Sequence, residues 1–68
     1  MDEYWVNNRT DTNPNNDHEV HKEGCPVMPD DKTYLGLHDN CNSALHKARA
    51  YYSSVDGCIP CIPECHDR

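Results

Sequence analysis

The chain has little from which to build a hydrophobic core. It has 68 residues, contains no Phe, and only 35% of its residues are hydrophobic. Ordering a chain costs about 1.5 kcal/mol per residue, and a chain this short buries only about 60% of the surface that its unfolded form exposes. We therefore expect a covalent or metal cross-link to supplement the core of one small domain.

Clustered positive charge is also missing. The net charge is −6, and the six Lys and Arg residues are scattered along the chain. Binding to nucleic acid or to an anionic membrane surface requires clustered Lys and Arg, so we expect no nucleic-acid or membrane partner. The remaining expectation is a protein partner, with the oligomeric state open and a monomer as the default.

Targeting, membrane-spanning and catalytic patterns are absent as well. The N-terminus has no basic start and no apolar run of signal-peptide length, and nothing approaches the roughly 20 apolar residues of a transmembrane helix. We therefore expect a cytoplasmic protein, whose thiols stay reduced and whose cysteines more often bind metal than form disulfides. Since no Ser-His-Asp spacing, phosphate-binding glycine loop or His-Glu-x-x-His motif occurs, we predict that it is not an enzyme.

Hydrophobic patterning predicts short strands and one helix. The strands cover residues 3–8, 18–21 and 33–37, and Gly36 either weakens the third strand or marks a bulge. The helix covers residues 40–52, capped by Asp39 or Asn40, and its apolar face contains Cys41, Ala44, Leu45, Ala48 and Tyr52. This pattern predicts an α+β fold, a zinc-knuckle mini-domain with a small antiparallel β-sheet of two to three strands plus one α-helix.

The organisation along the chain is simple. We treat residues 1–68 as a single domain, because the chain is too short for two. Within it, residues 1–17 form an N-terminal strand and polar loop, residues 18–61 a metal-knuckle core, and residues 62–68 a tail. The first two strands would form a hairpin with a long polar tip.

Five Cys and five His are many for this length, and four of them have the spacing of a metal site. Cys58 and Cys61 are separated by two residues, so both sulfurs can point at one tetrahedral ion. His21 and Cys25 supply the other half. Three thiolates and one imidazole form a closed zinc set and favour zinc over calcium or magnesium, so we predict one structural zinc ion as the cofactor.

Alternatives remain open for several of these residues. Cys65 could replace His21 as a ligand, or two disulfides could form among the five cysteines, in any of 15 pairings. Cys58 and Cys61 could instead be a redox pair. Cys41 reads best as a small buried hydrophobic residue, and otherwise as a disulfide partner of Cys65 or a ligand.

The other histidines have simpler interpretations. His38 and His46 are expected on the solvated surface. His18 lies three positions before His21, so on a strand it would face the opposite side of the sheet. A metal-bound His21 would need a hydrogen-bond acceptor for its second ring nitrogen, and the nearby carboxylates are Asp17, Glu19 and Glu23, among which the sequence does not choose.

The chain resembles a family of short uncharacterised bacterial Cys/His-rich proteins, which has no assigned activity. This resemblance spans nearly the whole chain and rests on Tyr4, Asn7, His18-Glu19-Val20-His21, Cys25, Tyr34-Leu35-Gly36, Cys41, Ala44, Ala48, Tyr52, Asp56-Gly57-Cys58, Cys61 and Cys65-His66.

A looser resemblance is to the small Ada-type metal-binding module of a DNA-repair protein, with His-x3-Cys followed by a strand, a helix and Cys-x2-Cys. It covers about residues 18–61 and implies a structural metal knuckle beside a hairpin and a helix. The chain departs from that pattern because Gly57 directly precedes the first Cys of the second pair, and Cys41 and Cys65 are additional. Repair chemistry is therefore not carried over.

Two functions from different classes follow. The first is a small structural zinc-binding protein of unknown process that acts as a protein-interaction module, with Trp5 and the tyrosines serving more as core than as contact residues. The second is a thiol redox or metal-handling protein that uses Cys58 and Cys61. A disulfide-stapled domain without metal is a further alternative.

Overall fold

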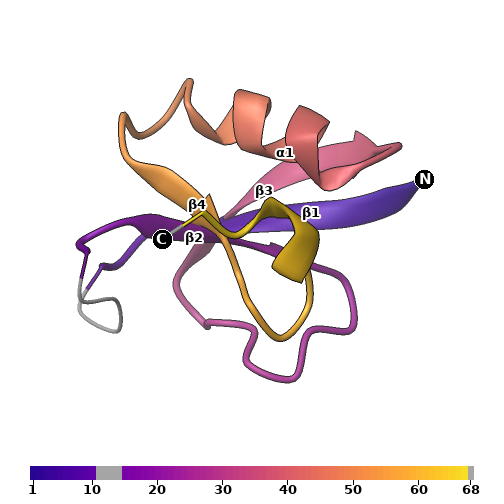
Figure 1. Ribbon diagram of the computed structural model, residues 1–68, viewed down its shortest axis with the longest axis horizontal. Coiled ribbons are helices and arrows are strands. Elements are labelled where there is room, and N and C mark those ends of the chain that lie inside the picture. The colour runs from indigo at the N-terminus through magenta and orange to yellow at the C-terminus, as the bar shows by residue number, and fades with distance from the viewer. Residues whose placement is uncertain (11–14, 68) are drawn as a thin grey trace.

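The computed structural model describes residues 1–10 and 15–67. The described chain forms strands β1 (Asp2–Asn7), β2 (His18–Lys22) and β3 (Lys32–His38), helix α1 (Cys41–Ala48), strand β4 (Val55–Gly57) and a short 3-10 helix, η1 (Pro63–Cys65). The strands make one sheet in the order β3-β1-β2-β4, and α1 lies over one face of it (Figure 1). The predicted α+β class with one helix is confirmed, and part of the predicted polar loop, residues 11–14, lies outside the described residues.

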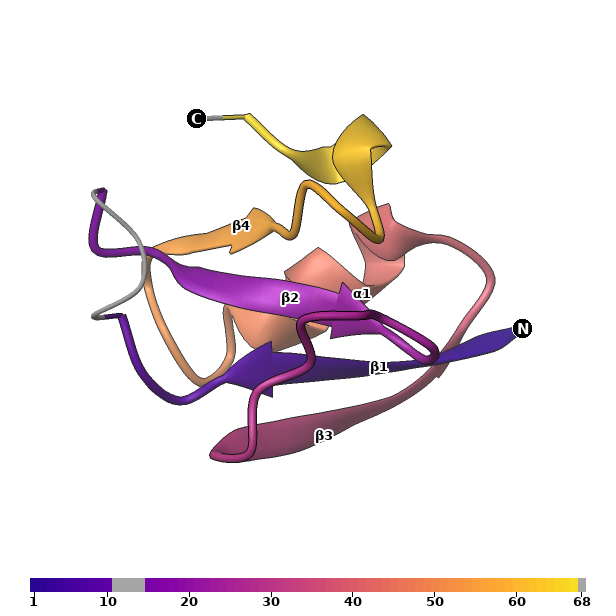
Figure 2. The same ribbon diagram turned by 90° about the horizontal axis from the view of Figure 1, so that it is seen from below.

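The central strands show the alternation that the sequence predicts. β1 and β2 pair antiparallel, and Val6 lies opposite Val20, both fully buried on the face that α1 covers. Trp5 lies opposite His21, so these two side chains point to the other face. The connector between β2 and β3 crosses this second face (Figure 2). The sheet therefore has an apolar side under the helix and a side that carries His21 under a loop.

Strand β3 contains the bulge that Gly36 suggested. The register against β1 shifts between Tyr4, which lies opposite Gly36, and Trp5, which lies opposite Tyr34. Leu35 is the extra residue, and it is buried. Gly36 has φ +95°, a backbone conformation that residues with a Cβ rarely adopt, so the bulge depends on glycine at this position.

Helix α1 begins where predicted and ends earlier. The Asn40 side chain accepts a hydrogen bond from the Ser43 amide at 2.9 Å, which identifies Asn40 as the N-cap. The helix ends at Ala48, four residues before the predicted end. Beyond this end, the Tyr52 ring stacks on His18 with centroids 3.6 Å apart, and the Tyr52 hydroxyl donates to Asn8 at 2.8 Å. The buried face contains Cys41, Ala44, Leu45 and Ala48.

The sheet has four strands and is mixed, which corrects the predicted antiparallel sheet of two to three strands. β4 pairs parallel with β2, and Val20 lies opposite Gly57. No strand was predicted here from the sequence, because three residues that include Asp56 and Gly57 carry no strand pattern. The pairing joins segments more than 30 residues apart, so local patterning does not reveal it.

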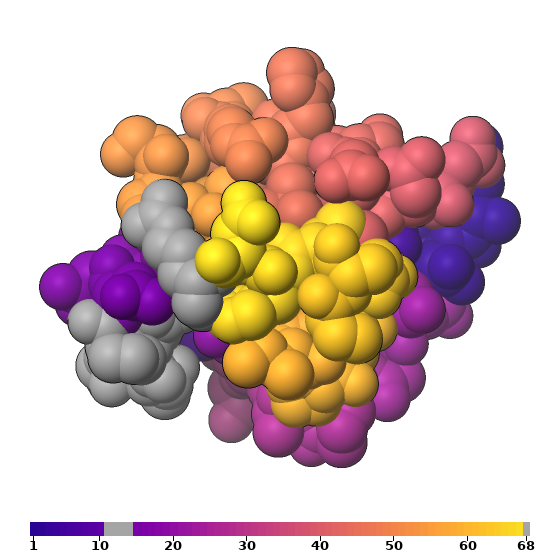
Figure 3. All heavy atoms as spheres, in the orientation of Figure 1, coloured from indigo at the N-terminus to yellow at the C-terminus, as the bar shows by residue number. Residues whose placement is uncertain are grey.

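The C-terminal tail is fastened to β4 and to α1. A disulfide joins Cys65 in η1 to Cys41 at the start of α1, with 6.3 Å between the two Cα atoms. Asp56 Oδ2 lies 3.1 Å from His66 Nδ1, and Asp56 Oδ1 accepts the Asp67 amide at 2.8 Å. In Figure 3 the yellow tail lies against the orange residues that precede it in the chain.

Substitution of Gly57 tests how closely the tail packs on β4. A Cβ at Gly57 would lie 2.8 Å from the backbone carbonyl carbon and oxygen of Cys65, so the tail would have to shift. We expect Gly57→Ala to lower the free energy of unfolding by about 1–3 kcal/mol, as overpacking does. Chemical denaturation measures this, with the exposed His46→Ala as the control, and equal stability of the two variants would contradict the packing.

Candidate metal centre

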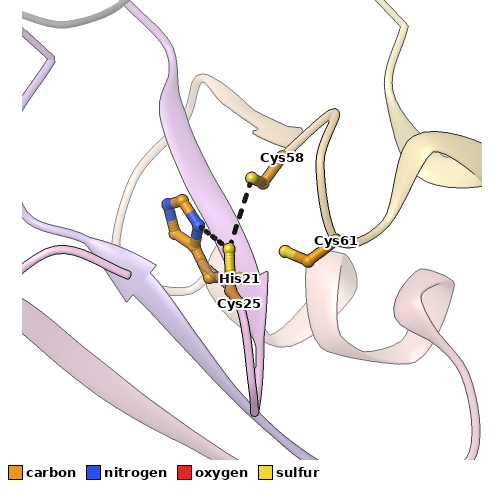
Figure 4. A group of neighbouring side chains, drawn as sticks. All are labelled: His21, Cys25, Cys58 and Cys61. Atoms are coloured by element: carbon orange, nitrogen blue, oxygen red, sulfur yellow. Dashed lines mark hydrogen bonds between the residues drawn. The ribbon is translucent and has the colours of Figure 1, made fainter. Parts of the chain in front are cut away.

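Four side chains from two distant segments meet on the face of the sheet away from α1. His21 is in β2, and Cys25 lies in the turn that follows, where the Cys25 amide donates to the Lys22 carbonyl at 3.1 Å. Cys58 directly follows β4, and its amide donates to the Val20 carbonyl at 3.0 Å, which continues the parallel pairing. Figure 4 shows the side chains of His21, Cys25, Cys58 and Cys61 directed toward a common centre.

The distances within this group, which we call the Cys3His cluster, are those of a compact ligand set. One ligand atom from each of the four residues lies within 4.8 Å of the others. His21 Nδ1 is 3.4 Å from Cys25 Sγ, and Cys25 Sγ is 3.7 Å from Cys58 Sγ. Cys61 Sγ accepts the Lys22 amide at 3.5 Å. The four predicted ligands are therefore close enough to bind one metal ion.

The cluster is largely sealed from solvent. His21, Cys25 and Cys58 are buried, and Cys61 is half-buried. Burial lowers the pKa of His21 from 6.5 to about 4, because the imidazolium form would lose its hydration. His21 is thus held in the neutral form that binds metals.

The thiols respond to burial in the opposite sense. Burial raises the pKa of Cys58 and the pKa of Cys61, because a thiolate without a counter-charge is disfavoured in this environment. A divalent cation supplies that counter-charge and deprotonates a coordinating thiol outright. Without a cation the cluster therefore favours unreactive thiols over activated nucleophiles.

The two remaining cysteines lie outside the cluster. Cys65 does not replace His21 as a ligand, because its sulfur is bonded to Cys41. Cys41 is buried on the apolar helix face, as its sequence position predicts, and it also has the Cys65 partner that was the alternative interpretation.

The histidines outside the cluster divide into two groups. His46 is exposed, as predicted. His38 is half-buried instead of fully solvated, because its ring bonds the Ser43 hydroxyl and the Leu35 carbonyl, both at 2.8 Å. His18 stacks on Tyr52 and has a different orientation from His21, as its strand position predicts. The contacts of His38 with Ser43 and of His18 with Tyr52 join different elements, so the local sequence does not predict them.

Comparison with known proteins adds no relative. No family model matches the chain, and neither a curated protein nor a solved structure matches it. Within residues 1–10 and 15–67, no helix has the length and apolar content needed to cross a bilayer. The case for a function therefore depends on the Cys3His cluster alone.

Acidification tests the neutral state of His21. Its pKa is lowered in the fold, so between pH 6.5 and about 4 the unfolded chain binds a proton that the folded chain does not. The stability that a neutral His21 contributes is therefore fully present above pH 6.5 and falls as the pH drops toward 4, and a bound ion, which protons displace from His21, would steepen the loss. Denaturant titrations at several pH values measure this loss of stability. The control variant His46→Ala should show the same loss. A free energy of unfolding that does not change with pH would contradict a neutral, buried His21.

Proposed function

We propose that this chain is a small zinc-binding domain in which the ion is a structural cross-link. The observation that carries the proposal is the convergence of His21, Cys25, Cys58 and Cys61, whose ligand atoms lie within 4.8 Å of one another. The two halves of the cluster, His21 with Cys25 and Cys58 with Cys61, are far apart in the sequence. An ion bound there would join the β2 turn to the segment after β4, which is the kind of cross-link that a thin core requires.

Two of the ligand separations agree with a tetrahedral ion of the size of zinc. Zn–S bonds of about 2.3 Å at tetrahedral angles place two sulfurs about 3.8 Å apart, and a Zn–N bond of about 2.0–2.1 Å places nitrogen and sulfur about 3.6 Å apart. The corresponding separations are 3.7 Å for Cys25 Sγ to Cys58 Sγ and 3.4 Å for His21 Nδ1 to Cys25 Sγ. The set of soft ligands supports the same choice.

The ligand count favours a structural role over catalysis. Four protein ligands complete a tetrahedral zinc site and leave no open position for a water or a substrate. Three thiolates and one dication add a single negative charge, which takes the protein from −6 to −7. The Lys22 amide already donates to Cys61 Sγ, and such hydrogen bonds stabilise a coordinated thiolate. We therefore infer that the domain is not an enzyme.

A protein partner fits the remaining surface better than nucleic acid does. The net charge of −6 disfavours contact with phosphates. Tyr34 is 47% exposed and contacts Trp5, with ring centroids 5.4 Å apart, on the sheet face away from α1. Exposed aromatic side chains are typical anchors of protein interfaces, so we infer an interaction module that uses Trp5 and Tyr34.

Metal handling is the second candidate, and one observation favours it. Cys61 is only half-buried, so its sulfur is the ligand that an exchanging partner would reach first. A thiol redox role for Cys58 and Cys61 has less support, because burial raises the pKa of both thiols and redox cysteines require thiolates. Structural zinc binding and metal handling use the same cluster. They differ in whether the ion stays bound or is transferred to a partner.

Removal of the metal tests the structural role. We expect chelation to abolish the folded circular dichroism spectrum, and Cys58→Ser and Cys61→Ser to unfold the domain, since structural zinc contributes about 10–16 kcal/mol in small metal-folded peptides. Metal analysis of the purified protein should find one zinc per chain. His46→Ala, exposed and outside the cluster, is the control and should melt like the wild type. A cooperative melt of Cys58→Ser at the wild-type temperature would refute the proposal.

Native mass spectrometry separates the two candidate functions. A structural ion should remain bound, one per chain, when a stoichiometric excess of a competing apo zinc-binding peptide is added for hours. A metal-handling protein should transfer its ion to that peptide within minutes. A redox protein should instead lose two hydrogens in mass on oxidation of Cys58 and Cys61 and regain them on reduction.

A further inference from the structure

The second ring nitrogen of His21, Nε2, has no partner within the Cys3His cluster. Figure 4 shows Nδ1 directed at Cys25 and the other nitrogen, Nε2, directed away from the cluster. Nε2 is buried and has no hydrogen-bond partner among the described residues. If Nδ1 binds an ion, Nε2 must carry the ring proton, and a buried donor without an acceptor costs about 1–3 kcal/mol. A loaded site therefore needs an acceptor on this side.

A cavity of about 330 Å³ lies beside His21 and contains a suitable group. Its lining residues are Asn7, Glu19, His21, Val27 and Pro29. Glu19 precedes His21 by two residues on β2, so both side chains leave the same face of the strand. The β1–β2 register, continued by one residue pair, places Asn7 opposite Glu19. Val27 and Pro29 belong to the connector that crosses this face, and they complete the lining of the cavity.

The lining of the cavity distinguishes Glu19 from the other two carboxylates near His21. Within the described part of the chain, Asp17 and Glu23 are not among the residues that line the cavity. Glu19 is the carboxylate that lines the cavity together with His21. Among the three carboxylates that the sequence offered, the placement therefore selects Glu19.

We propose that Glu19 is the positioning residue of the metal centre, whose carboxylate accepts the Nε2–H of His21 when Nδ1 binds the ion. This inference rests on the proposed zinc site. The bond fixes the ring tautomer with Nδ1 free to coordinate, and the carboxylate makes the imidazole a stronger ligand. It also satisfies the donor that metal binding leaves buried. Glu19 thus acts through His21 and does not touch the ion.

Metal affinity tests the proposal with a matched control in the same strand and turn. Glu19 and Glu23 lie two residues before and two residues after His21, and each substitution removes one negative charge. We expect Glu19→Ala to weaken zinc binding about 10–100-fold in competition with a chromophoric chelator, the effect typical of such outer ligands. Glu19→Gln, which keeps an acceptor oxygen, should recover much of the loss. Glu23→Ala should stay within about twofold of the wild type.

Nuclear magnetic resonance supplies a readout that general destabilisation would not move. In protein loaded with zinc or ¹¹³Cd, ring ¹⁵N shifts should identify Nδ1 as the ligand and Nε2 as the protonated nitrogen. The Nε2–H resonance should shift upfield and exchange faster in Glu19→Ala, and it should keep its position in Glu23→Ala. Equal affinities for the two alanine variants, an unmoved Nε2–H resonance, or coordination through Nε2 would overturn the role of Glu19.

The two proposals fail in different ways. A wild-type protein that binds neither zinc nor cadmium would refute the metal site itself. A wild-type protein that binds zinc through the four ligands, with Glu19→Ala and Glu23→Ala indistinguishable, would leave the site intact and refute only the positioning by Glu19.

Discussion

The parallel pairing of β4 with β2 is the constraint on which the candidate site depends. Cys58 is the first residue after β4, and its amide bonds the Val20 carbonyl, one residue before His21. This single backbone hydrogen bond sets Cys58 beside His21. Cys61 then reaches the same centre through a turn closed by the Ile62 amide and the Cys58 carbonyl at 2.8 Å. The register of β4 against β2 therefore determines where Cys58 and Cys61 lie relative to His21.

The tail is held by the Cys41–Cys65 disulfide, which connects α1 to η1. On the face away from α1, the Cys3His cluster brings the β2 turn close to the segment after β4, and an ion bound there would add a second cross-link. The fully buried Ile62, one of the few large apolar residues of the core, lies in the sequence between Cys61 of the cluster and Cys65 of the disulfide. Such cross-links can replace part of the core in a chain with so little apolar area. Disulfides are more typical of oxidising compartments, so the expected cytoplasmic location stays a prediction.

Much of the fold and the four clustered residues were predictable because their signals are local or chemical. The alternation of Tyr4, Trp5 and Val6 identified β1, and the capping residues Asp39 and Asn40 identified the start of α1, with the structure selecting Asn40 as the cap. His21, Cys25, Cys58 and Cys61 were found because few other side chains bind zinc and their spacing suits a tetrahedron.

The missed features depend on contacts between distant segments. Strand β4 is defined by its partner β2, and Tyr52, the predicted last residue of the helix, instead stacks on His18. The proposed role of Glu19, instead of Asp17 or Glu23, rests on the lining of the cavity beside His21. Local secondary-structure propensities do not predict such contacts between distant segments.

The arrangement of the five cysteines has a consequence for the order of assembly. Free in an unfolded chain, five thiols can oxidise into many wrong isomers. A chain whose Cys25, Cys58 and Cys61 are already occupied by an ion offers only Cys41 and Cys65 to an oxidant, and these two are adjacent in the fold. Early metal capture would therefore act as a protecting group during maturation, and a single oxidation product would emerge without the help of an isomerase.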